Sequence, residues 1–337
     1  MKGLRVVVPV PFFDKIATIS VLRLGDPTVS VARYWKTNRE PSPELKREWR
    51  EGNIIPIDVG REKYSAIGRP SALERLLEVL SIPKNRAIDE LADLVAKNNA
   101  TGFLKSAPYS IVWILREAYK LGYDTDEVVE AVLHMMSTWF AAYELLQDDA
   151  VFDNPGCLNL VIRVARGQEI RPFTVAEYMQ NMRMLDVDEG EIVDRAMYFV
   201  KIEDEARARQ LAAEKKWREA KKHGGALRFW SEIGLKCGGW AASIDTDCQY
   251  LGRAGFAAGI GLRMLEIRDS VGHETILTRG MSLAAAAPKI MQGEIAEGDE
   301  RWHYEIRGEE SLLNGTFTLP EIPPTSKNRS EIRRILG

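Results

Sequence analysis

The segment Gly52-Asn-Ile-Ile-Pro-Ile-Asp58-Val-Gly60 constrains the fold of this chain more than any other stretch. Apolar residues follow one another here without alternation, and an acid and then a glycine end the run. A continuous apolar run of this length, bounded by turn residues, is typical of a strand buried on both faces of a parallel sheet. Because ligands bind outside the carboxyl ends of such strands, Asp58 is predicted to project into a site.

The first segment of the chain follows the same plan. Residues 4–8 are predicted to form a strand, Asp14 follows in the turn, and a helix is predicted over 15–24. With a second strand over 29–33, this order indicates a doubly wound α/β layer in which Asp14 and Asp58 follow adjacent strands. Two acids so placed are the skeleton of a metal or phosphate site. Alternatively, Asp14 caps its own helix and Asp58 caps a turn.

The middle of the chain is predicted to be helical. Two capping boxes, Ser71 with Glu74 and Thr174 with Glu177, each mark the start of a helix. Apolar residues at helical spacing predict further helices over 85–98, 108–121 and 126–147.

A pattern without proline then runs from 188 to 223 and ends at a glycine pair. A helix of about 35 residues is about 50 Å long, so we interpret it as a connection between two domains; two helices with a kink are the alternative. Its predicted inner face carries Ile192, Val193, Ala196, Phe199, Val200, Leu211 and Trp217.

Glycines and short strands replace the helical pattern beyond residue 223. The pattern predicts two β-hairpins, one formed by residues 261–268 with 274–278 and the other by residues 302–306 with 310–313. The predicted fold is therefore an N-terminal α/β domain with a parallel sheet and helical extensions, a connecting helix and a smaller α+β domain. The predicted ranges are 1–187, 188–223 and 224–337.

Length and composition agree with two domains of an ordinary globular protein. The 337 residues exceed the comfortable size of one core, and a net charge of −3 gives no global attraction to nucleic acid. No apolar run approaches the roughly 18–20 residues of a membrane span, and the N-terminus lacks a cleavable signal pattern. Three cysteines without a Cys-x-x-Cys pair indicate reduced thiols, so a cytoplasmic protein without a membrane partner is expected.

The first strand–helix unit resembles the DHH phosphoesterase superfamily, most closely the branch of the melanocyte-proliferating-gene exonucleases. That branch has a His-x-Gly-x-Phe-His-x-Asp-Glu motif before a helix ending in Leu-Arg-Leu. Here the corresponding text is Val7-Val8-Pro9-Val10-Pro11-Phe12-Phe13-Asp14-Lys15, leading to Leu22-Arg23-Leu24. Ile57-Asp58-Val59-Gly60 resembles the family's Val-Asp-Val-Gly strand end, with Tyr64 following, and Leu312-Leu-Asn-Gly315-Thr316 resembles a Leu-Asn-Gly-Ser element of prokaryotic relatives.

The departures from the family pattern bear on its chemistry. The resemblance implies two manganese ions held by Asp and His side chains and a metal-activated water that hydrolyses a phosphodiester. Val7 and Phe12 replace both histidines of the first motif, and Ser65 to Ala72 stands where Asp-His-His is expected. Manganese or magnesium is therefore expected only if Asp14, Asp58 and a third acid, Asp149 or Asp153, converge. The alternative for this third acid is a solvated helix end.

Other candidate binding residues lie in the C-terminal half. Lys215, Lys216 and Arg218 surround Trp217 and would bind phosphates while the indole stacks on a base. Lysines at a helix end and a tryptophan on its apolar face are the structural alternative. Gly259 and Gly261 are candidates for close phosphate approach, or for strand packing, and His303 for facing a ligand or being a half-buried strand residue.

Two functional hypotheses follow. The first is a DHH-like protein that has lost its catalytic residues and acts by binding single-stranded nucleic acid or a protein partner. The second is an active metal-dependent phosphodiesterase that uses Asp14 and Asp58. Convergence of the acids would favour the enzyme, whereas Val7 and Phe12 filling the space between them would favour binding. A third hypothesis is a homo-oligomer in which the long helix pairs with a copy of itself.

Overall fold

A computed structural model of the chain describes residues 4–35, 41–59, 71–80, 82, 86–102, 104, 109–145, 173–223, 227–230, 240–248, 250–258, 261–292, 295–296, 299–300, 302–307, 309–314 and 324–336. Contacts divide it into two compact units, which we describe separately. The first comprises Met1–Trp35 and Pro41–Glu205, and the second includes Ala206–Gly337. The division at residues 187 and 223 expected from the sequence stays a prediction.

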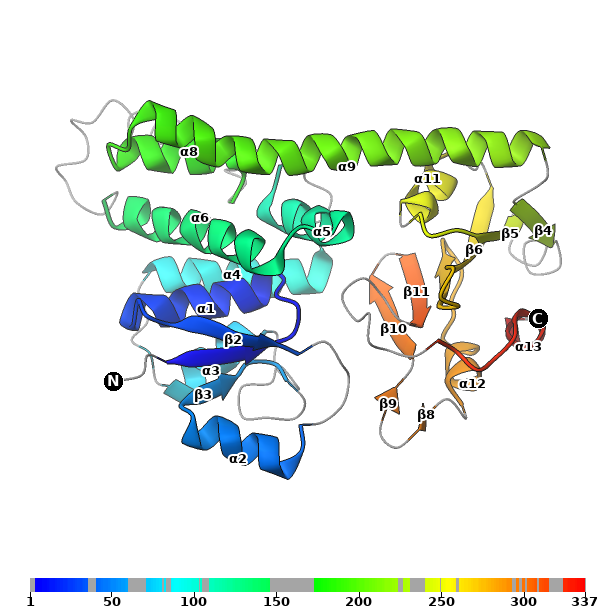
Figure 1. Ribbon diagram of the computed structural model, residues 1–337, viewed down its shortest axis with the longest axis horizontal. Helices are drawn as coiled ribbons and strands as arrows, with labels where there is room; N and C mark the ends of the chain where they lie inside the picture. Colours follow the sequence, from blue (N-terminus) through cyan, green and yellow to red (C-terminus); the bar gives the residue numbers. More distant parts are fainter. Residues whose placement is uncertain are drawn as a thin grey trace. The chain divides into compact units, whose positions relative to one another are not determined.

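The first unit contains a small parallel sheet. In its described residues, β1 (Arg5–Val8) lies between β2 (Ser30–Tyr34) and β3 (Ile54–Pro56), and both neighbours run parallel to it (Figure 1). The parallel layer and the adjacency of β1 and β3 are as predicted. However, β3 is half-buried along its length, so its predicted burial on both faces is wrong. Among the described strands β3 lies at an edge of the sheet, which explains its exposure, whereas Val6 to Val8 in the central strand are buried.

Helices pack around α1 (Phe13–Gly25), which begins shortly after the first strand. It contacts helices of the predicted helical extension: α3 (Ala72–Leu80), α4 (Arg86–Thr101), α5 (Ile111–Leu121) and α6 (Thr125–Leu145). The short α2 (Pro43–Glu51) packs against β3, and α8 (Val175–Met184) packs against α6 (Figure 1). The predicted helices of this unit are confirmed, with ends displaced by a few residues.

Polar side chains cap the N-termini of α3 and α8. Ser71 Oγ accepts a hydrogen bond from the Glu74 amide (3.0 Å), and Thr174 Oγ1 accepts one from the Glu177 amide (3.2 Å). Both predicted N-caps are thereby confirmed, because each side chain satisfies an amide that lacks a partner within its helix.

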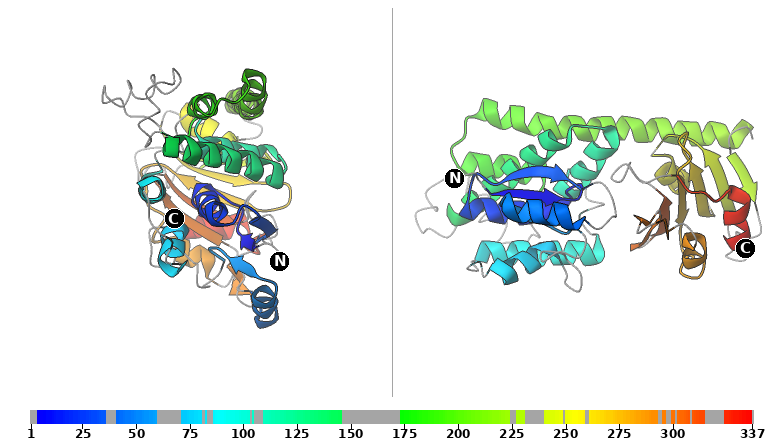
Figure 2. Two further views of the ribbon diagram at one scale, coloured as in Figure 1. Left: turned by 90° about the vertical axis from the view of Figure 1, so that its left-hand side faces the viewer. Right: turned by 60° about the horizontal axis from the view of Figure 1, so that its bottom comes forward.

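The long pattern forms one helix, α9 (Glu189–His223), which the right-hand view of Figure 2 shows along its length. The alternative of two helices is therefore wrong. Ile192, Phe199 and Trp217 are buried as predicted. Val193 and Leu211 are instead 43% and 59% exposed, so their assignment to the inner face is also wrong.

The second unit contains a mixed sheet. Its described strands lie in the order β10 (Trp302–Arg307), β11 (Glu309–Asn314), β7 (Glu274–Thr278), β6 (Leu262–Arg268), β5 (Trp240–Asp245) and β4 (Leu227–Trp230). The pairs β6–β7 and β10–β11 are antiparallel, which confirms both predicted hairpins. A core on the sheet includes Met264, Ile276, Trp302, Leu312 and Ile332.

Short elements complete this unit. They are α11 (Leu251–Ala258), α12 (Ala287–Met291), the two-stranded ribbon of β8 (Ile295–Ala296) and β9 (Asp299–Glu300), and the C-terminal α13 (Arg329–Leu336). Of these, α13 contributes Ile332 to the core and packs against α12.

Candidate functional site

The two acids predicted to form a site do converge, but on a lysine. Asp14 is the second residue of α1 and Asp58 follows β3. The Lys15 Nζ lies 2.5 Å from Asp58 Oδ2 and 3.3 Å from Asp14 Oδ2. A positive charge on the chain itself therefore stands where a metal ion shared by these two carboxylates would be placed.

Asp14 has a second role that the sequence did not indicate. Its Oδ2 accepts a hydrogen bond from the Ala72 amide (3.1 Å) and its Oδ1 accepts one from the Leu73 amide (3.2 Å). These amides begin α3, where they have no partner within the helix, and a carboxylate there also complements the helix dipole. Asp14 is therefore not the cap of its own helix, which has Phe12 at that position without a side-chain hydrogen bond.

Asp58 lies in an uncommon backbone conformation. Its φ of 53° is in the left-handed region, which aspartate tolerates better than most other non-glycine residues. Asp58 is 23% exposed at its side chain, so this end of the pair is reached by solvent.

Electrostatics stabilise the lysine in its charged form. Burial by itself lowers the pKa of the Lys15 ammonium, but Asp14 and Asp58 raise it by more, and the pKa lies above its ordinary value. The ammonium is consequently charged at neutral pH and balances one of the two carboxylate charges.

Asp14, Lys15 and Asp58 do not fit the dinuclear metal site that the resemblance to the DHH phosphoesterases implies. Both carboxylate oxygens of Asp14 already accept hydrogen bonds from backbone amides, and the Lys15 ammonium contacts both carboxylates. Two divalent ions about 4 Å apart need more ligands than two engaged carboxylates supply. Among the described residues, no group of three or more His, Cys, Asp or Glu side chains is placed to hold a metal ion. Asp149 and Asp153 lie outside the described residues.

Val7 and Phe12, which stand where the resembled motif has histidines, are apolar packing residues. Val7 is buried with Trp35, Trp49 and Val59. Phe12 packs edge-on against Tyr119, with ring centroids 5.6 Å apart. Both side chains therefore serve packing, and the space between the acids is taken by Lys15. The only signal for Lys15 in the sequence is that it stands where the family motif has Glu.

The basic segment on α9 does not combine stacking with phosphate contacts. Trp217 is 2% exposed, and its ring lies 3.1–3.3 Å from where a Cβ on Gly255 would be. The indole is thus buried against α11, and the predicted stacking on a base is wrong. The side chains of Lys215 and Arg218 are 79% and 69% exposed, whereas Lys216 Nζ donates to Thr246 Oγ1 (3.1 Å).

The remaining candidates are dispersed. Gly261 has φ +82° in the turn before β6, which explains the glycine without a ligand. Gly255, which precedes Gly259 and Gly261 in the sequence, lies in α11. His303 lies in β10 opposite Leu313, and only its backbone is described. Gly259 lies outside the described residues.

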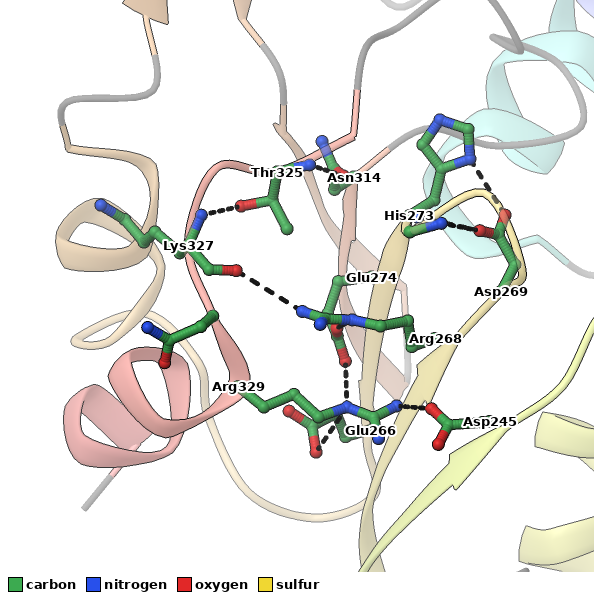
Figure 3. Close-up of polar contacts among 12 residues, drawn as sticks. Asp245, Glu266, Arg268, Asp269, His273, Glu274, Asn314, Thr325, Lys327 and Arg329 are labelled. Carbon is green, nitrogen blue, oxygen red and sulfur yellow. Dashed lines mark hydrogen bonds and ion pairs between the residues drawn. The ribbon is translucent and has the colours of Figure 1, made fainter.

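A second charged cluster, which sequence reasoning missed, lies within the second unit (Figure 3). Glu266 and Glu274 are fully buried on neighbouring strands. Arg268 Nε donates to Glu274 (2.5 Å), and Arg333 donates twice to Glu266 (3.0 and 3.2 Å). Arg329 Nη2 lies 2.6 Å from Asp245 Oδ1, and its Nε is 3.7–3.8 Å from both glutamates.

This cluster joins α13 to the sheet. Two of its three arginines come from α13, and each buried carboxylate is within 4 Å of a guanidinium. Burial and the neighbouring Glu266 raise the pKa of Glu274, against the lowering effect of Arg268 and Arg329, to about 7. Because these charges compensate one another, we interpret the cluster as structural.

Comparisons with known proteins gave matches among solved structures. No family model matches the chain, and no curated protein matches it. Among solved structures, the pGpG-specific phosphodiesterase PggH from Vibrio cholerae is 8% identical, with a TM-score of 0.45 over 98% of each chain. RecJ from Thermus thermophilus, in complex with Mg²⁺, is 12% identical, with a TM-score of 0.38 over 99% of this chain and 50% of RecJ.

A further structure, of the exonuclease RecJ bound to manganese, is 11% identical, with a TM-score of 0.38 over 99% of this chain and 90% of the other. Since these TM-scores are below 0.5, any functional proposal has to depend on the chain's own residues.

In the described part of the chain, no helix has the length and apolar character needed to cross a bilayer.

Proposed function

We propose that this chain is a DHH-phosphoesterase-like protein without the dinuclear metal site, which acts by binding nucleic acid or a protein partner. The observation that carries the proposal is the position of the Lys15 ammonium, 2.5 Å from Asp58 and 3.3 Å from Asp14. An ammonium at hydrogen-bond distance neutralises carboxylates, but it cannot activate water or bridge two phosphate oxygens as a divalent ion does.

The pattern of retained and replaced residues supports the same reading. The strands that precede Asp14 and Asp58, β1 and β3, are adjacent, so the scaffold that would position a site is present. The two motif histidine positions are Val7 and Phe12, which pack in apolar surroundings. Loss of ligands with retention of the scaffold is what a binding protein derived from a hydrolase would show.

The alternative is an active phosphodiesterase that uses Asp14, Asp58 and Asp149. Convergence of Asp14 and Asp58 is the observation in its favour. For this alternative to operate, Lys15 must leave both carboxylates and Asp14 must give up its α3 amides. Losing those contacts costs free energy that metal binding would have to supply.

Turnover assays separate the two functions. The purified full chain is incubated with Mn²⁺ or Mg²⁺ and short single-stranded RNA and DNA, and we expect no metal-dependent cleavage. Asp58→Asn is the matched variant, because asparagine keeps the shape and also tolerates a positive φ. Asp14→Ala is less suitable, since it also removes the α3 cap. Robust turnover that disappears in Asp58→Asn would overturn the proposal.

Binding assays with the same oligonucleotides then identify the class of partner. If the partner is nucleic acid held by Lys215 and Arg218, affinity falls steeply with salt and falls further when both residues become alanine. Unchanged affinity in that variant would remove this surface from the proposal. No binding of either oligonucleotide would leave a protein as the partner.

A further inference from the structure

The exposed side of α9 carries an apolar stripe. We define the α9 stripe as Val193, Met197, Val200 and Leu211. Val193, Met197 and Leu211 are 43%, 53% and 59% exposed, while Val200 is half-buried. Val193 and Leu211 lie about five helical turns apart and therefore share one angular position, and the other two lie within about 40° of it. The stripe thus follows one line of a single continuous helix and is interrupted between Val200 and Leu211 by the charged residues Asp204 and Arg207.

Charge is divided along the same helix. Residues 189–205 contain six acids and two bases, whereas residues 206–223 contain seven bases and two acids. On the side of the stripe, the N-terminal half carries exposed Glu189 and Asp204, and the C-terminal half carries exposed Lys215 and Arg218. The pairs Arg218–Glu214 (3.6 Å) and Lys215–Glu219 (3.9 Å) neutralise part of the basic half, but its excess positive charge remains.

A helix with these two properties complements itself when reversed. In an antiparallel pair related by a two-fold axis, the acidic half of each copy faces the basic half of the other, and the two stripes meet. A parallel pair would instead place like charges together along both halves. The antiparallel arrangement also sets the two helix dipoles in opposite directions.

We propose that the α9 stripe is the contact surface of an antiparallel homodimer of this chain. The partner is a second copy, because the acidic and basic halves of one helix supply both sides of the charge complementarity. The proposal uses none of the residues around Lys15, but it shares Lys215 and Arg218 with the surface that would hold nucleic acid, so the test below includes nuclease treatment.

The mass of the full chain in solution tests the pairing. Sedimentation velocity over a concentration series is expected to show a dimer for the wild type and a monomer for Leu211→Asp, which places a charge in the stripe. Burying a side chain of this size is worth more than about 1.4 kcal/mol, so we expect at least a tenfold weaker dimer. Ala212→Asp is the matched control, because Ala212 is also exposed but lies about 100° around the helix from Leu211.

The orientation is tested by charge reversal. Glu189→Lys with Asp204→Lys, and Lys215→Glu with Arg218→Glu, are each expected to weaken self-association. Mixing the two variants is expected to restore the dimer, because each reversed half then meets an opposite charge. A wild-type monomer at all concentrations, a Leu211→Asp dimer as tight as the wild type, or a larger mass that disappears with nuclease would overturn the proposal.

Discussion

Lys15 holds together two carboxylates that would otherwise repel each other. Its ammonium is 2.5 Å from Asp58 and 3.3 Å from Asp14, and its side chain is 19% exposed. Removing one partner from such a pair leaves charge without compensation in a poorly solvated place. Lys15 is therefore the residue on which the stability of the site depends most directly.

We expect Lys15→Met to lower the free energy of unfolding by about 2–4 kcal/mol, somewhat less than for a fully buried ion pair. Urea denaturation of the full chain measures this, and Lys289→Met, at an exposed lysine of α12, is the matched control. Adding Asp58→Asn to Lys15→Met should recover part of the loss, because it removes the repulsion. A change no larger than that of the control would show that the ion pairs are unimportant.

The pH dependence of the Lys15 contribution follows from its raised pKa. A lysine whose pKa is higher in the folded state contributes stability that is fully present below the ordinary pKa of 10.5 and is lost as pH rises through the folded value. The difference in unfolding free energy between the wild type and Lys15→Met should therefore be constant from about pH 6 to 9 and shrink at more alkaline pH. A difference that already shrinks within that neutral range would contradict this.

Glu274 has linkage of the same sign as Lys15, but in a lower pH range. Its pKa of about 7 exceeds the ordinary 4.5, so the folded state binds its proton more tightly than the unfolded state does. The stability from this protonation is complete below pH 4.5 and is lost as pH rises through 7. Between about pH 5 and 8, the wild type should lose stability relative to Glu274→Gln, which cannot ionise. Glu48→Gln, at an exposed acid, controls for the charge, and a pH-independent difference for Glu274→Gln would contradict the prediction.

The sequence predicted the two acids of the site but not the contacts that they make. The two acids were found because strand-end positions follow from local pattern. Lys15 was missed, because a lysine beside an acid at a helix start is usually solvated, and only the convergence of β3 with α1 brings Asp58 to it. The partner of Asp14 was missed for the same reason, since Ala72 and Leu73 are distant in sequence.

At the scale of secondary-structure elements, local signals predicted the helices well. Caps such as Ser71 and Thr174 act within one turn, so their effect can be read from a few residues. Burial of a whole strand depends on its place in the sheet, which explains the error for β3. The faces of α9 were assigned incorrectly at Val193 and Leu211, because apolar residues occur around much of this helix.

The end of α5 gives an element-scale prediction. Gly122 has φ +79° and donates its amide to the last turn of the helix, and a Cβ there would meet no atom within 4 Å. Gly122→Ala should therefore cost about 1 kcal/mol of unfolding free energy from backbone conformation alone. Gly25→Ala is the matched control, since it also has open space but no positive φ, and thermal denaturation should show no loss for it. Equal effects of the two substitutions would refute this explanation.

At the scale of the whole molecule, the small parallel sheet, the long helix and the two C-terminal hairpins were predictable because each has a distinct periodicity, whereas β4, β5 and the parallel β5–β6 pair were not predicted. The contacts divide the chain at Glu205 and Ala206, within α9, whereas the sequence marks only the two ends of that helix. Contacts between residues distant in sequence set such a division, and hydrophobic patterning does not record them.

The claim that a lysine stands in place of a metal is tested most directly by calorimetric titration of Mn²⁺ into the full chain. We predict that the wild type shows no saturable binding. Lys15→Met should gain weak binding, which a further Asp58→Asn substitution removes, because only the loss of the ammonium lets the two carboxylates share an ion. Stoichiometric Mn²⁺ binding by the wild type that is abolished by Asp58→Asn alone would contradict the claim.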